Sequence, residues 1–205
     1  MRLPARFLLL LVGCVVLGVG VAMLLTADLG SDGYSTLVRG LSLSTGLAFW
    51  SANVVVGVAF LAVSSSRGVY PGVGTVVQVV VVGAVVTWLL DVLDTPGSML
   101  ARIALLVGAM VVIAAGVAGY LGSHLGAAPI EAAGLAWDPP VPFRWSYSAV
   151  QLGGSLLGWW LGATIGVGTL AVIVLLGPMV DLASRWLRLD VHQGRTSEGG
   201  VPTHP

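Results

Sequence analysis

Residues 145–180 read WSYSAVQLGGSLLGWWLGATIGVGTLAVIVLLGPMV, a run without a single charged side chain. A membrane-spanning helix needs roughly 20 apolar residues to cross about 30 Å of hydrocarbon. The run is therefore too long for one span of ordinary tilt. Its glycines at 162, 166 and 168 predict a tight turn, which divides the run into two spans of about 145–163 and 167–187.

The rest of the 205-residue chain has the same character. It is 57% hydrophobic and 9% charged, whereas soluble domains are about a quarter charged, which excludes a water-soluble enzyme or nucleic-acid-binding protein. Four more apolar windows are long enough to span, at about 7–27, 47–64, 71–90 and 103–122. We predict an all-α integral membrane protein with six transmembrane helices, forming one membrane domain over residues 1–190, and a disordered cytoplasmic tail at 191–205.

The arginines predict the orientation. Six spans with a cytoplasmic N-terminus place seven arginines inside and two outside, as the positive-inside rule expects. A single span over 145–180 would leave four inside against five outside. We therefore expect a multi-pass membrane protein with both termini in the cytoplasm. The inside set is Arg2, Arg6, Arg67, Arg144, Arg185, Arg188 and Arg195, and the outside set is Arg39 and Arg102.

The chain also repeats itself. A shift of 96 positions places Leu29-Gly30 on Leu125-Gly126, and a shift of 94 places Gly72-Val73-Gly74-Thr75 on Gly166-Val167-Gly168-Thr169. The predicted repeats, about 7–93 and 99–188, each hold three spans. An odd number of spans reverses direction, so the repeats must be inverted, as in many secondary transporters. This is an analogy of fold, which does not fix function.

The segments that follow the two Leu-Gly pairs are the main candidate sites. Each is long, apolar and non-spanning, which predicts a short interfacial or re-entrant helix. In the functional interpretation, Gly30 and Gly126 expose backbone N–H groups to a ligand, and Asp28, Asp32 and Glu131 supply charge. In the alternative, the helices lie on the membrane surface with their carboxylates in water.

Three further polar side chains fall within predicted spans. Asp181 is either a functional ionisable group or the partner of Arg185 at the helical i+4 spacing. Gln78 and Gln151 are candidate ligand contacts, although most such residues form interhelical hydrogen bonds.

The sequence does not predict catalytic residues, a metal site or a cofactor. We identify no nucleophile–base arrangement, so we expect no enzyme and no catalytic residue. One cysteine and three scattered histidines predict no metal site, and we expect no cofactor. The expected partners are the lipid bilayer, a small-molecule or ion solute, and a second copy of the chain or another membrane protein. No nucleic-acid partner is expected.

The ordered motifs resemble those of the YczE/YyaS/YitT-type bacterial membrane proteins. The matching segments are Ala27-Asp28-Leu29-Gly30, Pro71-Gly72-Val73-Gly74-Thr75 and 158–178. Three positions depart from the family pattern. Asp32-Gly33 replaces a Pro-Trp pair, Ile130-Glu131 replaces Arg-Asp, and Gln151 replaces an acid. The resemblance implies a protein of the bacterial cytoplasmic (inner) membrane without a settled activity.

Together these features favour a transporter of a small solute or ion. The alternative is a non-catalytic scaffold or accessory protein for a membrane complex, which the scarcity of charge within the spans favours.

Overall fold

The computed structural model describes residues 2–137, 140–141 and 143–187, without the side chains of residues 143, 144 and 181. Within these residues the chain forms eight α-helices and no strand, so the all-helical prediction is confirmed. The helices are α1 (Leu3–Ala27), α2 (Gly33–Thr45), α3 (Phe49–Ser66), α4 (Val73–Val92), α5 (Met99–Leu121), α6 (Pro129–Leu135), α7 (Phe143–Trp160) and α8 (Val167–Leu187).

Five of the six predicted spans are helices long and apolar enough to cross a membrane: α1, α3, α4, α5 and α8. The chain therefore has the character of a multi-pass membrane protein. The uncharged stretch forms two helices, as predicted, with Gly162 at φ +100° in the connection between them. The first of the two, α7, is not among the five, because serine, tyrosine and glutamine side chains interrupt its apolar sequence. A sixth span at α7 stays a prediction.

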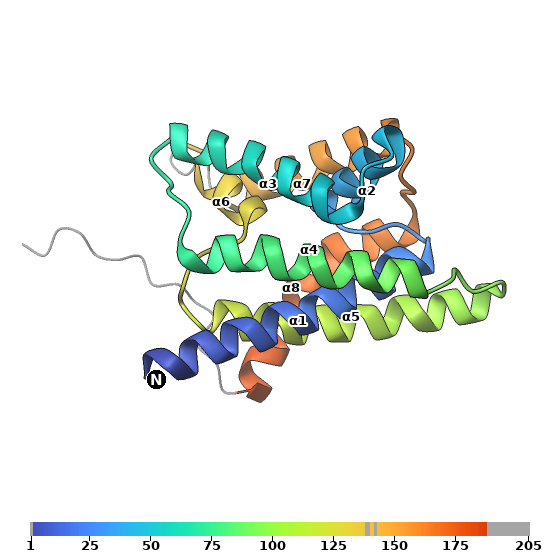
Figure 1. Cartoon of the computed structure of the whole chain (residues 1–205), viewed down its shortest axis with the longest axis horizontal. Coiled ribbons are helices and arrows are strands. Elements are labelled where there is room, and N and C mark those ends of the chain that lie inside the picture. Colours follow the sequence, from blue (N-terminus) through green and yellow to red (C-terminus); the bar gives the residue numbers. More distant parts are fainter. Residues whose placement is uncertain (1, 138–139, 142, 188–205) are drawn as a thin grey trace, which may run out of the picture.

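Helices α1, α4 and α5 lie side by side along the longest axis of the molecule (Figure 1). Helix α1 packs on α5 and α4, and α5 packs on α8. A second layer contains α2 against α7 and α6 against α3. The N-terminus of α1 and the α3–α4 connection lie at one end, which we call the Arg6 end. The α4–α5 connection lies at the other, the Arg102 end.

Small residues permit the closest helix contact, between α1 and α5. A Cβ added to Gly13 would lie 2.5 Å from the backbone nitrogen of Tyr120, and one added to Gly116 would lie 2.5 Å from that of Leu17. Both glycines are therefore required for this approach, which is typical of helix packing in membranes. Around it, Leu10, Leu24 and other apolar side chains form the buried core.

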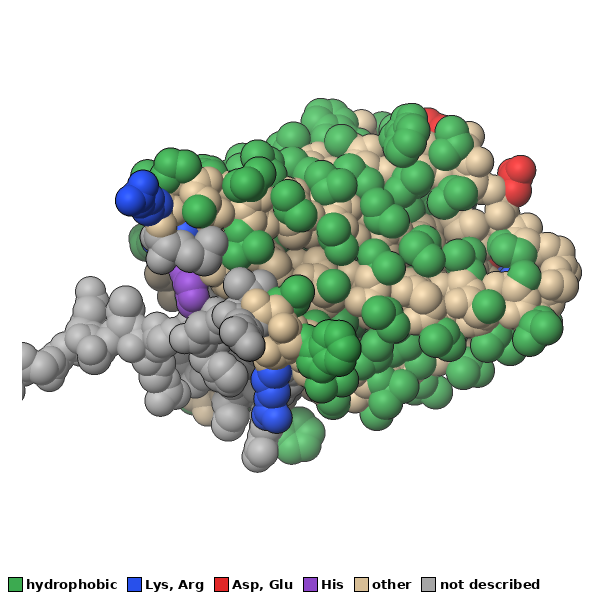
Figure 2. Space-filling model, turned by 90° about the horizontal axis from the view of Figure 1, so that it is seen from below, with side chains coloured by type: hydrophobic (Ala, Val, Ile, Leu, Met, Phe, Trp, Pro, Cys, Tyr) green, Lys and Arg blue, Asp and Glu red, His purple; other side chains and the backbone are tan. Residues whose placement is uncertain are grey.

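Apolar side chains also cover the outside. Trp88 and Leu100 are 65% and 79% exposed, and hydrophobic side chains spread over the face seen in Figure 2, with the charged ones lying toward its ends. Patches of this extent on a soluble protein would be an aggregation hazard. In a bilayer they would face the lipid.

Short helices occur where the Leu-Gly segments predict them. Asp32 caps the start of α2, and its side chain accepts a hydrogen bond from the Ser35 backbone N–H at 3.0 Å. Helix α6 begins with Pro129, a favourable first residue, and the Glu131 carboxylate accepts from the Ala128 N–H at 2.9 Å. The two helices lie toward opposite ends of the molecule (Figure 1).

Candidate functional site

Each Leu-Gly segment is seated on the other half of the chain. The Gly168 N–H at the start of α8 donates to the Leu29 carbonyl at 2.8 Å, and the Gly74 N–H at the start of α4 donates to the Leu125 carbonyl at 2.8 Å. Gly30 and Gly126 follow these carbonyls with φ values of +101° and +141°. Only glycine adopts such angles without strain. Because the two hydrogen bonds match, the repeated Leu-Gly and Gly-Val-Gly-Thr motifs form two equivalent contacts.

Two arginines form a second equivalent pair of contacts. Arg6 donates to the carbonyls of Ser123 at 2.7 Å and His124 at 2.6 Å, at the end of α5. Arg102 donates to the carbonyl of Ala27 at 2.7 Å and to the carbonyl of Asp28, at the end of α1. The last carbonyls of a helix lack partners within it. Arg102 supplies a partner for the last carbonyl of α1, whereas Arg6 contacts carbonyls just beyond the end of α5.

Between the two ends, α2 starts beside the middle of α7. The Gly33 N–H donates to Gln151 Oε1 at 2.6 Å, and Gln151 Nε2 donates to the Tyr147 hydroxyl at 3.0 Å. The buried side chain of Gln151 thus supplies a hydrogen-bond acceptor for the first turn of α2. The aspartate that caps this turn, Asp32, interacts electrostatically with Tyr147.

The first turn of α6 approaches the same tyrosine. Both carboxylate oxygens of Glu131 accept hydrogen bonds from the Tyr120 hydroxyl, at 2.5 and 2.6 Å, and Glu131 also interacts electrostatically with Tyr147. We call Asp32, Glu131 and the side chains that join them, Tyr120, Tyr147 and Gln151, the central polar cluster.

The two carboxyl groups of this cluster have perturbed protonation. Burial raises the pKa of Asp32 and of Glu131, although hydrogen bonds from Ser35 to Asp32 and from Tyr120 and Ala128 to Glu131 act in the opposite direction. Neither carboxyl pairs with a cation among the described residues. A proton or another small cation would stabilise either carboxylate. No group of three His, Cys, Asp or Glu side chains that could hold a metal ion occurs in that part of the chain.

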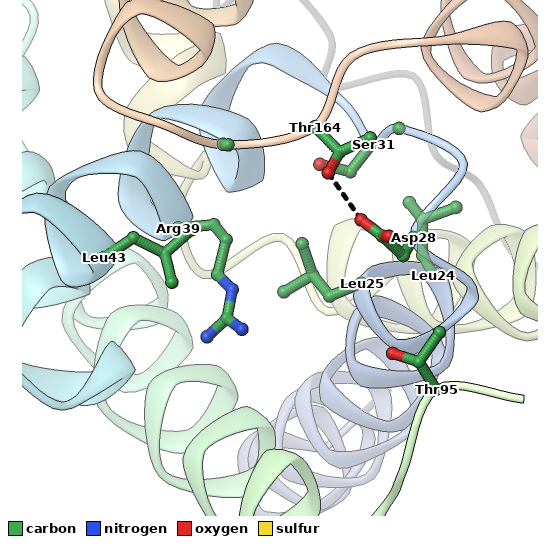
Figure 3. Close-up of a pocket in the computed structure, with 10 residues that line it drawn as sticks. Leu24, Leu25, Asp28, Ser31, Arg39, Leu43, Thr95 and Thr164 are labelled. Atoms are coloured by element: carbon green, nitrogen blue, oxygen red, sulfur yellow. Dashed lines mark hydrogen bonds between the residues drawn. The ribbon is translucent and has the colours of Figure 1, made fainter.

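A pocket of about 250 Å³ opens at the Arg102 end (Figure 3). It lies between the end of α1, one side of α2, and the α4–α5 and α7–α8 connections. Asp28 and Thr164 are hydrogen-bonded to each other in its wall, and Arg39 of α2 also lines it. The full lining is Leu24, Leu25, Asp28, Gly30, Ser31, Arg39, Leu43, Thr95, Ala163 and Thr164.

The predicted site residues thus divide into groups. Three lie in the central polar cluster (Asp32, Glu131 and Gln151) and two in the pocket (Asp28 and Gly30). Gly126 packs against Thr75 of α4. A Cβ added to Gly126 would lie 3.0 Å from Thr75 Oγ1. Gln78 is buried in α4, and its Oε1 has no partner among the described residues.

Asp181 belongs to α8, but its side chain lies outside the described residues, as do most of the α7 approach at 138–142 and the whole predicted tail at 191–205.

Sequence reasoning did not identify Arg39, Tyr120 or Tyr147 as site residues. A signal for Arg39 was present, because it is the only charged side chain between Gly33 and Thr45, in a segment already predicted to be short and apolar. For the two tyrosines there was none, since their roles depend on contacts with distant carboxyl groups.

Comparisons with known proteins place the chain in a family. An uncharacterised protein of Haemophilus influenzae is 24% identical over 175 residues, which cover 84% of this chain and 80% of that protein. No solved structure matches. Residues 4–185 match a family described as a family of unknown function (DUF6198), which leaves the YczE/YyaS/YitT resemblance a prediction. Because this match covers most of the sequence, the chain belongs to the DUF6198 family of unknown function.

Proposed function

We propose that this chain is a transporter of a small solute or ion in the bacterial cytoplasmic membrane, with six spans arranged as two inverted repeats. The observation that carries the proposal is the reciprocal exchange of contacts between the halves. Leu29 and Arg6 contact the second half as Leu125 and Arg102 contact the first. Helices related by a two-fold axis in the membrane plane would make such paired contacts.

The helix pairs support the same symmetry. The contact of α1 with α4 corresponds to that of α5 with α8, and the contact of α2 with α7 corresponds to that of α6 with α3. In this arrangement α7 of the second repeat corresponds to α3 of the first, and α7 is therefore the sixth span. Arginines at the Arg6 end then face the cytoplasm, with both termini.

The central polar cluster is the proposed coupling site. In inverted-repeat transporters, sites lie near the midplane where the repeats meet, and the ends of broken or short helices face the cargo. Helices α2 and α6 both start at this cluster, each with a carboxyl group in or before its first turn. Ionisable groups at such depth are costly and mark ion and substrate pathways.

Topology is tested by cysteine labelling. The exposed positions Ser44 and Leu135, near the ends of α2 and α6, are suitable labelling sites. In a Cys14→Ala background, Ser44→Cys should react with a membrane-impermeant maleimide from outside intact cells, and Leu135→Cys only after permeabilisation. Reaction of both from the same side would contradict the inverted arrangement.

Transport is tested in two steps. Purified protein is screened by thermal unfolding against metabolites and ions, because a ligand that binds the folded state raises its stability. Compounds that stabilise it are then assayed for flux into proteoliposomes. Glu131→Gln should abolish the stabilisation. Asp138→Asn is the control, because Asp138 precedes a proline-rich segment at 139–142 that the sequence predicts to be extended and exposed. A stoichiometric membrane partner in mild detergent, without any stabilising solute, would instead support the accessory-protein alternative.

A further inference from the structure

We propose that the pocket at the Arg102 end binds a small anion, through a carboxylate or phosphate group held by Arg39. The pocket is separate from the central polar cluster and shares no lining residue with it. Its side chains come from both halves of the chain, since Thr164 lies in the α7–α8 connection and Asp28 ends α1. The inference stands on binding alone and does not require that the protein transport anything.

The charge of the pocket carries the argument. Asp28 already has two partners: its Oδ2 is 2.9 Å from Arg102 in an ion pair, and its Oδ1 accepts from the Thr164 hydroxyl. Arg39 has no ion pair or hydrogen bond with any described residue. The Asp28 carboxylate is therefore already paired with Arg102, and Arg39 is a positive charge of the pocket that has no counterion among the described residues.

The surroundings of Arg39 make an anion the fitting ligand. Its helical neighbours Val38 and Gly40 are buried and the arginine itself is only partly exposed, so its charge interacts more strongly than it would in open water. A guanidinium presents a planar fork of N–H donors that matches carboxylate and phosphate oxygens. The hydroxyl of Thr95 lines the same pocket and makes no hydrogen bond with the described residues, which leaves it available as a second donor.

The size of the pocket limits the ligand. A volume of about 250 Å³ corresponds to roughly eight water molecules at about 30 Å³ each. Inorganic phosphate or a short dicarboxylate fits this space. The same chemistry is present in an anionic lipid headgroup, which could enter from the surrounding bilayer, so the experiment must separate the two sources.

The experiment measures thermal unfolding of the purified full chain in a neutral detergent. The probes are inorganic phosphate and succinate, each compared with sodium chloride at equal ionic strength. Either probe should raise the unfolding temperature of the wild type and of Arg2→Gln, which removes an exposed arginine at the opposite end. Arg39→Gln should weaken binding at least tenfold, and Arg39→Lys should restore part of it.

Asp28→Asn gives an independent test with the opposite sign. This change removes the only carboxylate of the pocket and releases Arg102, so it should strengthen anion binding. Asparagine tolerates the left-handed conformation of this position, at φ 49°. If Arg39→Gln fails to fold, Asp28→Asn still decides the matter, because unchanged or weaker binding would overturn the proposal.

Lipid vesicles distinguish the source of the anion. The protein is reconstituted in phosphatidylcholine alone or with one-fifth phosphatidylglycerol. Stabilisation by phosphatidylglycerol that depends on Arg39, with no response to phosphate or succinate in detergent, would identify a lipid headgroup as the ligand. A response to neither source, or an equal response in wild type and Arg39→Gln, would overturn the proposal. Failure of the transport assay would leave this binding result unaffected.

Discussion

Arg6 and Arg102 stand 96 positions apart, and the guanidinium of each binds backbone carbonyls at, or just beyond, the C-terminal end of the helix on which the other lies. The pair fixes both ends of the closely packed α1 and α5. Each arginine therefore has the same structural task, although the sequences around the two positions differ.

Replacing either arginine with glutamine should destabilise the protein to a similar degree. Charged hydrogen bonds contribute about 1.5–3 kcal/mol when buried, and partial exposure reduces this to about 1 kcal/mol. That corresponds to a fall of roughly 2–4 °C in unfolding temperature, measurable in detergent. Arg2→Gln, an exposed arginine before α1, is the control. A fall for only one of the pair would contradict their equivalence.

Two adjacent glycines of α7 should respond in opposite ways to alanine. A Cβ at Gly154 would lie 2.6 Å from the Gly33 carbonyl oxygen of α2, whereas a Cβ at Gly153 meets nothing within 4 Å. Gly154→Ala should cost about 1–3 kcal/mol by overpacking. Gly153→Ala should be neutral, or stabilising by up to about 1 kcal/mol, because alanine is the better helix former. Equal thermal stabilities of the two variants would show that α2 does not pack here.

The side chain of Gln151 should matter more than that of Gln78, although both lie buried in helices. Gln151→Leu leaves the Gly33 N–H without its acceptor, which costs about 1–3 kcal/mol. Gln78→Leu removes an oxygen that has no partner among the described residues and should cost far less. Comparing the two unfolding temperatures checks this. A larger loss at Gln78 would point instead to a bound molecule beside α4.

Glu131 should make the stability depend on pH. Because burial raises its pKa in the folded protein, the folded state holds the proton more tightly than the unfolded chain. Stability is therefore greatest near pH 4, the ordinary carboxyl range, and declines as pH rises through the raised pKa. Glu131→Gln should flatten this decline in unfolding temperature between pH 4 and 8.

Two comparisons isolate this contribution. The pKa of Asp32 is also raised, so some slope should remain in Glu131→Gln and disappear when Asp32→Asn is added. Asp94→Asn, at an exposed site in the α4–α5 connection, should keep the wild-type slope. An unchanged profile in Glu131→Gln would mean that its carboxyl is not desolvated in the folded state.

Features that depend on local pattern were predictable from the sequence. Long apolar runs locate α1, α3, α4, α5 and α8 to within a few residues, because burial in lipid demands length and apolarity together. The glycines near residue 162 correctly divide the last run. The shift of 96 positions pairs the two Leu-Gly segments, and the structure shows that these segments make matching contacts.

Features that depend on distant partners were not predictable. Nothing in the sequence near Gly33 indicates that its N–H meets Gln151, and the Tyr120–Glu131 bond joins two helices across a connection of irregular backbone. The same shift of 96 aligns Arg6 with Arg102, but only the packing of α1 on α5 shows what the two side chains contact. Asp28 was predicted as a candidate, whereas its neighbour in the pocket, Arg39, was not.

The exchange of the Leu-Gly segments has a consequence for synthesis of the protein. When the ribosome has completed α4, the residues of α8 that bind the Leu29 carbonyl and the residues of α7 that pack on α2 have not yet been made. The newly inserted first half must therefore wait without these contacts, although α2 can already pack on α3. Two fragments divided within residues 93–98 should accumulate in cells only when both are expressed together.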